Sequence, residues 1–352
     1  MRRLIFVIPG DLSSRTGGYD YDRRVLAALP NCGVEAVHRA LPASFPSPSV
    51  ADLEKSVQTI NFDPREGDIV LIDGLAYGAL SEAAIQRITA PIIALCHHPL
   101  CLEPGLDPKH SAALRDNERR ALALASHVIV TSPNTGALLT REFAVPEARI
   151  SVALPGTDQV DRARGSGGTP ALLAVGSIIP RKAFDVLVEA LAGLADLEWR
   201  LRIVGGDAYS PQTAIALDRL IAEKGVGGRI ERLGELSTDR LDKFFDASDI
   251  FVSSSLYEGF GMALAEALAR GLPIVTTTGG AAAETIPDAA GLKVPPGDID
   301  ALRSALCRLI VDAPLRARLS AESWRAGQTL PRWEDTARVI ARVACGAGKQ
   351  PQ

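Results

Sequence analysis

The sequence predicts an α/β protein made of two doubly wound domains, each a parallel sheet covered by helices. The chain has 352 residues, more than one hydrophobic core usually serves. Short apolar runs alternate with helix-forming segments, which is the pattern of parallel sheets. The alternation breaks once, in a glycine-rich segment at residues 161–170, and then begins again. Ligands are therefore expected in a cleft between the domains, at the carboxyl ends of the strands.

The first half of the chain contains five expected strands and four expected helices. The strands are short apolar runs, as expected for strands buried on both faces; they lie at residues 4–8, 69–72, 91–96, 127–131 and 150–153. The helices are expected in the longer, more polar segments between them, at residues 20–29, 81–89, 109–124 and 136–143.

The second half repeats this alternation. Strands are expected at residues 171–175, 200–204, 229–233, 250–254 and 273–277, and helices at residues 184–194, 212–224, 239–245 and 262–270. The helix at 262–270 consists almost wholly of strong helix formers, and Gly271 and Pro273 end it. An amphipathic helix over residues 332–343 follows Pro331.

The composition is that of an ordinary globular protein and excludes several classes. Residues are 47% hydrophobic and 23% charged, and the net charge is −4, so the chain lacks the basic excess that nucleic acids favour. Five scattered cysteines are too few for a disulfide framework or a zinc site. The first apolar run is too short for a signal peptide, and no run approaches a membrane span. A cytoplasmic protein is expected, with peripheral contact at the inner face of the membrane left open.

The most informative segment is Glu258-Gly-Phe-Gly-Met-Ala-Leu-Ala-Glu266. It begins in the loop after an expected strand and ends on the next helix. The N–H groups of Phe260, Gly261 and Met262 would form a positive helix entrance that suits an anion. Glu266 would lie roughly 6 Å further along the helix axis, about the step from a phosphate to its ribose. The segment therefore predicts a site for a nucleotide diphosphate and its sugar.

A second phosphate feature is the adjacent pair Arg181 and Lys182, which follows the expected strand at 171–175. Arg binds phosphate oxygens through paired donors and Lys through a point charge. Taken alone the pair also fits a solvated start of a helix. Because it shares a domain with Glu258, binding of a diphosphate is the favoured interpretation.

In the first domain, Gly17 and Gly18 are expected in the loop after the first strand, where their backbone could approach a ligand closely. A flexible turn is the alternative, because no dinucleotide or Walker pattern is present. His97 and His98 follow the strand at 91–96, where an imidazole could bond a sugar hydroxyl or cap the strand end. Asp73 follows another strand at the same edge, where it is either a further residue of the site or only part of a turn.

Two Asp-x-Asp pairs raise the possibility of a metal site. They are Asp20 with Asp22 and Asp298 with Asp300. Both are interpreted as carboxylates in the first turns of helices, where they oppose the helix dipole. No metal and no cofactor other than a nucleotide-sugar co-substrate are expected.

With these motifs assembled, the chain resembles the retaining GT-B glycosyltransferases of family 4, or glycosyl transferases group 1, over nearly its whole length. The segment from Glu258 to Glu266 looks like the family's paired-glutamate signature. The other similar features are Gly176 with Arg181 and Lys182, the Gly17-Gly18 loop, residues 154–158, residues 291–297 and Trp333.

The resemblance implies a GT-B architecture of two Rossmann-like domains that face each other across a cleft. Residues 1–163 would form the acceptor side and residues 168–330 the donor side. Residues 331–352 would form a C-terminal helix that crosses back to the first domain.

The resemblance also implies roles for the site residues. Arg181 and Lys182 would neutralise the donor diphosphate, and Glu258 would work at the transferred sugar. His97, favoured over His98 as the catalytic histidine, would lie near the reaction centre. The implied substrate-binding residues are Gly17, Gly18, His98, Gly234, Leu236, Phe260, Gly261, Met262 and Glu266.

The implied activity is transfer of a hexose from a UDP- or GDP-sugar to a saccharide, lipid or small-molecule acceptor, with retention and without a metal. An epimerase or phosphorylase on the same scaffold remains an alternative. A non-catalytic nucleotide-sugar-binding protein is a further alternative, although the presence of both glutamates argues against a loss of activity. The donor base, the sugar and the acceptor stay open.

Overall fold

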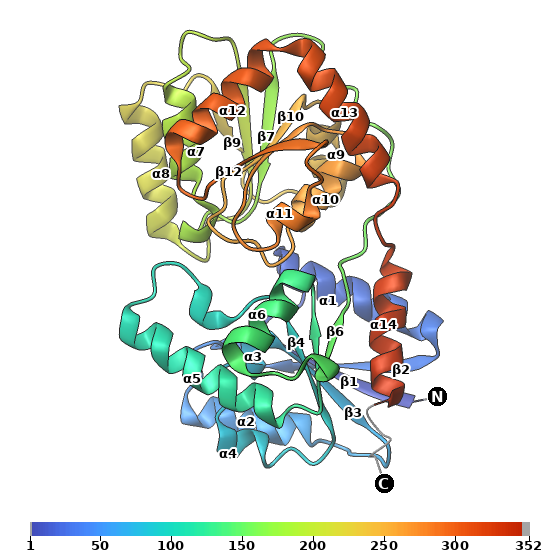
Figure 1. The fold of residues 1–352 in the computed structure, drawn as a ribbon. Coiled ribbons are helices and arrows are strands. Elements are labelled where there is room, and N and C mark those ends of the chain that lie inside the picture. Colours follow the sequence, from blue (N-terminus) through green and yellow to red (C-terminus); the bar gives the residue numbers. More distant parts are fainter. Residues whose placement is uncertain (1, 347–352) are drawn as a thin grey trace. The chain divides into compact units, whose positions relative to one another are not determined.

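The structure is a computed structural model that describes residues 2–346, and these residues form two compact units (Figure 1). The first unit comprises residues 2–156 and 331–346, and the second is Thr157–Leu330. Each unit holds one six-stranded parallel sheet with helices packed on it. The predicted two-domain α/β fold is confirmed. None of the described helices combines the length and the apolar character that crossing a membrane requires.

The sheet of the first unit has the order β2-β1-β3-β4-β5-β6. Its strands are β1 (Arg2–Pro9), β2 (Val34–Leu41), β3 (Ile69–Asp73), β4 (Ile92–Cys96), β5 (His127–Val130) and β6 (Ile150–Val152). The helices are α1 (Gly17–Ala28), α2 (Val50–Ile60), α3 (Gly74–Tyr77), α4 (Glu82–Ile85), α5 (Pro108–Leu124), α6 (Pro133–Phe143) and α14 (Trp333–Gly346), with 3-10 turns η1 (Leu29–Cys32), η2 (Leu100–Leu102) and η3 (Glu147–Arg149).

The second unit repeats this arrangement with the strand order β12-β11-β10-β7-β8-β9. Its strands are β7 (Ala171–Val175), β8 (Arg200–Val204), β9 (Ile230–Arg232), β10 (Ile250–Ser253), β11 (Ile274–Thr277) and β12 (Gly291–Val294). Its helical segments are η4 (Pro180–Lys182), α7 (Phe184–Ala192), α8 (Pro211–Glu223), α9 (Thr238–Asp246), α10 (Met262–Ala269), α11 (Ala282–Thr285), α12 (Ile299–Val311) and α13 (Ala313–Gly327).

Each of the ten expected strands is present within one or two residues, because central parallel strands are apolar on both faces. The sequence did not predict β2, which lies at the sheet edge and is buried only at its two ends, Val34 and Leu41. Nor did it predict β12, α2, α3, α11 and α13, whereas α12 begins where Asp298 and Asp300 were expected to start a helix. The helix expected at 81–89 is wrong in length, since α4 ends at Ile85.

The glycine-rich segment at residues 161–170, whose composition is typical of a linker, packs against the second unit. Gly165 N–H donates to Asp246 O (2.9 Å), and Ser166 N–H donates to Asp249 Oδ1 (3.1 Å). The second carboxylate oxygen of Asp249 accepts from Ala171 N–H, at the start of β7. The compact units therefore divide between Gly156 and Thr157, whereas the first domain was expected to end at residue 163.

The C-terminal helix α14 belongs to the first unit, as the fold class predicts. Thr336 Oγ1 donates to Leu154 O (2.6 Å), and the buried Trp333 ring meets Tyr21 edge to face at 5.8 Å. Gly156 makes this contact possible, because a Cβ there would lie 2.3 Å from Trp333 N. Residues 347–352 of the expected segment lie outside the described residues.

Candidate functional site

The loop after β10 places Glu258 against the backbone of the segment that follows β11. Glu258 N–H donates to Gly279 O (3.2 Å), and Ala281 N–H donates to Glu258 O (2.7 Å). A Cβ at Gly280 would lie 2.3 Å from Glu258 O, so only glycine permits this approach. The backbone of Glu258 is therefore fixed by the segment that follows β11, not by its own loop alone.

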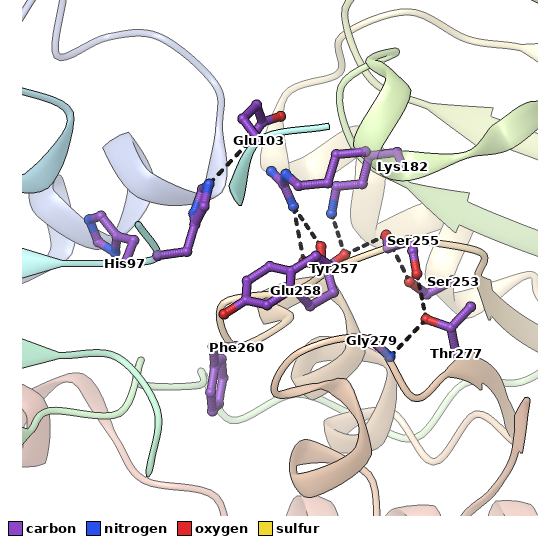
Figure 2. Close-up of polar contacts among 12 residues, drawn as sticks. His97, Glu103, Lys182, Ser253, Ser255, Tyr257, Glu258, Phe260, Thr277 and Gly279 are labelled. Atoms are coloured by element: carbon purple, nitrogen blue, oxygen red, sulfur yellow. Dashed lines mark hydrogen bonds and ion pairs between the residues drawn. The ribbon is translucent and has the colours of Figure 1, made fainter. Parts of the chain in front are cut away.

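The Glu258 carboxylate is buried and surrounded by donors (Figure 2). Lys182 Nζ lies 2.6 Å from Oε1, Arg181 Nη1 lies 3.7 Å from Oε2, and Ser255 Oγ donates to Oε1 at 2.6 Å. Burial by itself would raise the pKa of Glu258. The Lys182 and Arg181 cations outweigh it, so the pKa is lowered and the group is an anion at neutral pH.

Arg181 and Lys182 are placed by η4, which follows β7. Arg181 O accepts from Leu256 N–H (2.8 Å), and Ser254 Oγ donates to Lys182 O (2.9 Å). The Arg181 guanidinium also donates to Tyr257 O (3.0 Å). The two cationic side chains keep 15% and 17% exposure, so they remain within reach of a ligand while resting on Glu258.

The aliphatic stem of Lys182 lies over Gly176. A Cβ at Gly176 would lie 2.9 Å from Lys182 Cε and 3.1 Å from Cδ. Gly176 therefore provides the space in which the lysine extends toward Glu258.

Helix α10 begins next to this cluster, and its amides supply further positive charge. Gly261 precedes the helix with φ 91°, and no side chain caps the first turn. Thr285 Oγ1 donates to Phe260 O (2.6 Å) and fixes the turn. Glu266 is partly exposed on the helix, one residue beyond the buried Ala265. The segment has the expected loop-then-helix form, with unpaired helix amides beside two cations.

Two residues expected near the nucleobase lie in the loop between β9 and α9. Gly234 adopts φ 66° and its carbonyl accepts from Gly205 N–H (2.9 Å). The Leu236 side chain is buried in the core with Phe245 and Phe251, so only its backbone is left to face a ligand. Ser255, whose hydroxyl donates to Glu258 Oε1, and Thr277, whose hydroxyl donates to the backbone carbonyl of Ser255, were not predicted, because single hydroxyl residues carry no spacing signal.

In the first unit, His97 follows β4 and lies against two carboxylates. Its Nε2 is 3.2 Å from Asp73 Oδ2 and 3.6 Å from Asp22 Oδ1. Asp22 and Asp73 are 1% and 5% exposed, and the Tyr21 ring meets the imidazole edge to face at 5.1 Å. Desolvation would lower the pKa of His97, but the two carboxylates outweigh it and raise the pKa to about 10.

Two interpretations of the first unit are corrected by this geometry, and one is extended. Asp22 is not in the first turn of α1, which begins at Gly17, and its buried carboxylate lies beside His97. Asp73 does cap a turn, accepting from Leu75 N–H (2.9 Å), but its other oxygen faces His97. Gly17 and Gly18 are the first residues of α1 and not part of a loop, and a Cβ on Gly18 would lie 3.7 Å from His97 Cδ2.

The Asp22, Asp73 and His97 ligand atoms all lie within 4.8 Å of one another. Within residues 2–346 this is the one group of three such side chains that could hold a metal ion. Asp298 caps α12, accepting from Ala301 N–H, and Asp300 lies in the first turn of that helix. The neighbouring His98 is separate from the cluster, with Nε2 3.1 Å from Glu103 Oε2.

Comparison with known proteins identifies the family. The model of "Glycosyl transferases group 1" matches residues 158–324. The D-inositol 3-phosphate glycosyltransferase 2 of Catenulispora acidiphila is 30% identical over 76% of this chain and 67% of that protein. This chain belongs to the glycosyl transferases group 1.

The likeness extends to other members and to solved structures. The MMP alpha-(1->4)-mannosyltransferase of Mycolicibacterium hassiacum is 26% identical over 86% of this chain and 78% of that protein. Sucrose-phosphate synthase from Thermosynechococcus elongatus superimposes with a TM-score of 0.84 at 22% identity, over 98% of this chain and 99% of that one, which supports the GT-B fold. The chain spans 54% and 70% of the length of two other curated relatives.

Proposed function

We propose that this glycosyltransferase transfers a hexose from a UDP- or GDP-sugar, with retention of configuration and without a metal. The observation that carries the proposal is the placement of Arg181 and Lys182 on the buried Glu258, at the entrance of α10. The acceptor would be a saccharide, a lipid or a small molecule. The related enzymes that carry mannosyltransferase and inositol-phosphate glycosyltransferase names support transfer to a small acceptor.

The charge of this cluster suits a departing nucleoside diphosphate. Two cations facing one carboxylate leave a net positive site, and the open amides of α10 add to it. As the bond to the sugar breaks, negative charge grows on the diphosphate, where fixed donors stabilise it most. The cations would thereby take the part that a divalent metal plays in metal-dependent transferases.

The remaining roles follow the family resemblance. Glu258 and the amides of residues 260–262 would hold the sugar, and Glu266 would bond the ribose. The backbone at Gly234 and Leu236 would face the base. In same-face attack, a donor phosphate oxygen would take the proton of the acceptor hydroxyl. We place the protein in the cytoplasm, with contact at the inner face of the membrane if the acceptor is a lipid.

A binding screen followed by turnover tests the proposal. UDP, GDP, ADP, UDP-glucose and GDP-mannose are compared by thermal shift, because a ligand of the folded state raises the melting temperature. We expect UDP or GDP and the matching sugar nucleotide to stabilise the protein. Product formation should persist in EDTA, and the anomeric proton of the product should show retained configuration by NMR. Loss of activity in EDTA that added metal restores would refute metal independence.

The same assays separate the alternatives. Isomerised donor in the absence of acceptor would identify an epimerase, and dependence on inorganic phosphate a phosphorylase. Tight donor binding with neither hydrolysis nor transfer to a panel of sugar, lipid and polyol acceptors would indicate a binding protein. Any of these three results overturns the proposed function.

A further inference from the structure

The His97 imidazole lies against two carboxylates that come from different elements. Asp22 is on α1 and Asp73 ends β3, and both are more than nine-tenths buried. Two buried carboxylates this close repel each other and are costly to charge without a cation between them. The ring nitrogen that both of them face is Nε2 of His97.

The other groups around this cluster do not supply that cation. Arg23, on α1, is engaged elsewhere: its guanidinium donates to Leu12 O, Ser14 O and Asp20. Tyr21 contributes a ring edge and its hydroxyl donates to Ala153 O (3.0 Å). Asp73 Oδ1 accepts from Leu75 N–H, at the start of α3. Among the described residues, His97 is thus the cation placed to balance the two carboxylates.

The directions of the pKa shifts agree with the geometry. Both carboxylates raise the pKa of His97 to about 10, against the opposing effect of burial. Burial and the nearby Asp73 raise the pKa of Asp22 to about 7. At neutral pH the imidazole therefore keeps both of its protons.

We propose that Asp22 and Asp73 are positioning residues that hold His97 as a fixed imidazolium, with Nε2 beside the two carboxylates and the partly exposed ring available to the bound sugar substrate. This inference rests on the proposed function. It assigns His97 the role of a hydrogen-bond donor and cation. A doubly protonated imidazole has no lone pair, so His97 is not the base that removes the acceptor proton.

The test is a pH titration of the histidine side chains by NMR in the full-length protein. The chain has five histidines, and the His97 signals are assigned by their loss in His97→Gln. We expect His97 in the parent protein to remain protonated beyond pH 8. Asp22→Asn and Asp73→Asn should each lower its pKa by about 1–3 units, the effect of removing one adjacent opposite charge. Asp20→Asn, on the partly exposed face of the same helix, is the matched control and should leave it unchanged.

Two titration results would overturn the proposal. One is titration of the parent His97 near its ordinary value of about 6.5. The other is a His97 titration that neither asparagine variant alters while thermal unfolding shows both variants folded. A protein-bound metal, found by elemental analysis and lost in both His97→Gln and Asp22→Asn, would also overturn it, because the metal and not a protonated His97 would then balance the two carboxylates.

A second readout connects the cluster to turnover. With UDP-glucose or GDP-mannose as donor, kcat/KM of the parent should show no loss from His97 between pH 7 and 9. Asp73→Asn should gain an alkaline limb in that range, and an unchanged profile would argue against the role. The NMR titration needs no turnover, so failure of the proposed function and failure of this inference give different results.

Discussion

Lys182 Nζ lies 2.6 Å from Glu258 Oε1, and this ion pair joins segments 76 residues apart in the sequence. It brings the turn after β7 and the loop after β10 into one site. Both partners are largely buried, so the pair is less screened by water than a surface pair. A bound diphosphate would share Lys182 with Glu258.

Removing this lysine should abolish most of the activity. In Lys182→Ala we expect kcat/KM to fall by about 10²-fold or more, the usual effect of losing one donor to developing negative charge. Lys224→Ala is the matched control, because Lys224 Nζ also lies 2.6 Å from a carboxylate, that of Glu189, on a more exposed surface. Comparable losses in the two variants, or full activity in Lys182→Ala, would contradict the assigned role.

Stability should reveal how strongly the two residues depend on each other. Lys182→Ala leaves a buried carboxylate without its nearest cation, which should lower the free energy of unfolding by about 1–3 kcal/mol. Adding Glu258→Gln removes that charge, so the double variant should lose less than the sum of the single variants. Urea unfolding of the four proteins measures this coupling, and strictly additive losses would show that the pair contributes nothing as a pair.

Gly176 should affect nucleotide binding through the position of Lys182, and not only through the stability of the fold. The Cβ of Gly176→Ala would lie 2.9 Å from Lys182 Cε, the movable end of a flexible side chain, so the lysine should shift away from Glu258. At φ 157° the alanine also adds backbone strain, which thermal unfolding records separately. We expect UDP or GDP binding to weaken by about tenfold or more. Gly168→Ala, where a Cβ meets nothing within 4 Å, should bind like the parent.

Much of the fold could be predicted from the sequence because central parallel strands are uniformly apolar. The strand β3 is buried at each of its five positions, and its sequence IVLID shows this directly. The edge strand β2 carries Glu35, His38 and Arg39 among its apolar residues, so no continuous apolar run marks it. Its place in the sheet depends on pairing with β1, which local sequence does not record.

The segment from Glu258 to Glu266 could be recognised from the sequence because its residues are close together in the chain. The cluster of Asp22, Asp73 and His97 could not be recognised in this way. Asp22 lies four residues after Gly18, and from local sequence it looks like any carboxylate near a helix start. Its burial depends on where the ends of β3 and β4 meet α1, which is a tertiary property. The strand-end positions of Asp73 and His97 were the one usable signal, since carboxyl ends of neighbouring parallel strands share an edge.

The contact between Gly156 and α14 should set the stability of the first unit. In Gly156→Ala the new Cβ would meet backbone atoms of Arg332 and Trp333 within 2.7 Å, and backbone cannot yield as a side chain can. We expect a loss of about 1–3 kcal/mol in the free energy of unfolding, typical of overpacking. Gly136→Ala, within α6, is the control, because a Cβ there would meet only side chains of neighbouring strands at ordinary contact distance. Equal melting temperatures for Gly156→Ala and the parent would contradict the tight seating of α14.

The pH dependence of stability should carry the signature of the His97 cluster. The folded-state pKa of His97, about 10, is above its unfolded value of about 6.5, so its contribution is complete below pH 6.5 and is lost as pH rises toward 10. Asp22 acts in the same direction over a lower range: its folded-state pKa of about 7 is above its ordinary value of 3.8, so its contribution is lost as the pH rises between those values. Above pH 7 the decline in stability that comes from His97 should remain, with a slope of at most about 1.4 kcal/mol per pH unit.

In the double variant Asp22→Asn with Asp73→Asn, the buried imidazole has no anion beside it, so urea unfolding at pH 7, 8.5 and 10 should show this decline greatly reduced. Asp20→Asn should retain it, and a parent protein with no decline across this range would mean that His97 is neutral in the folded state.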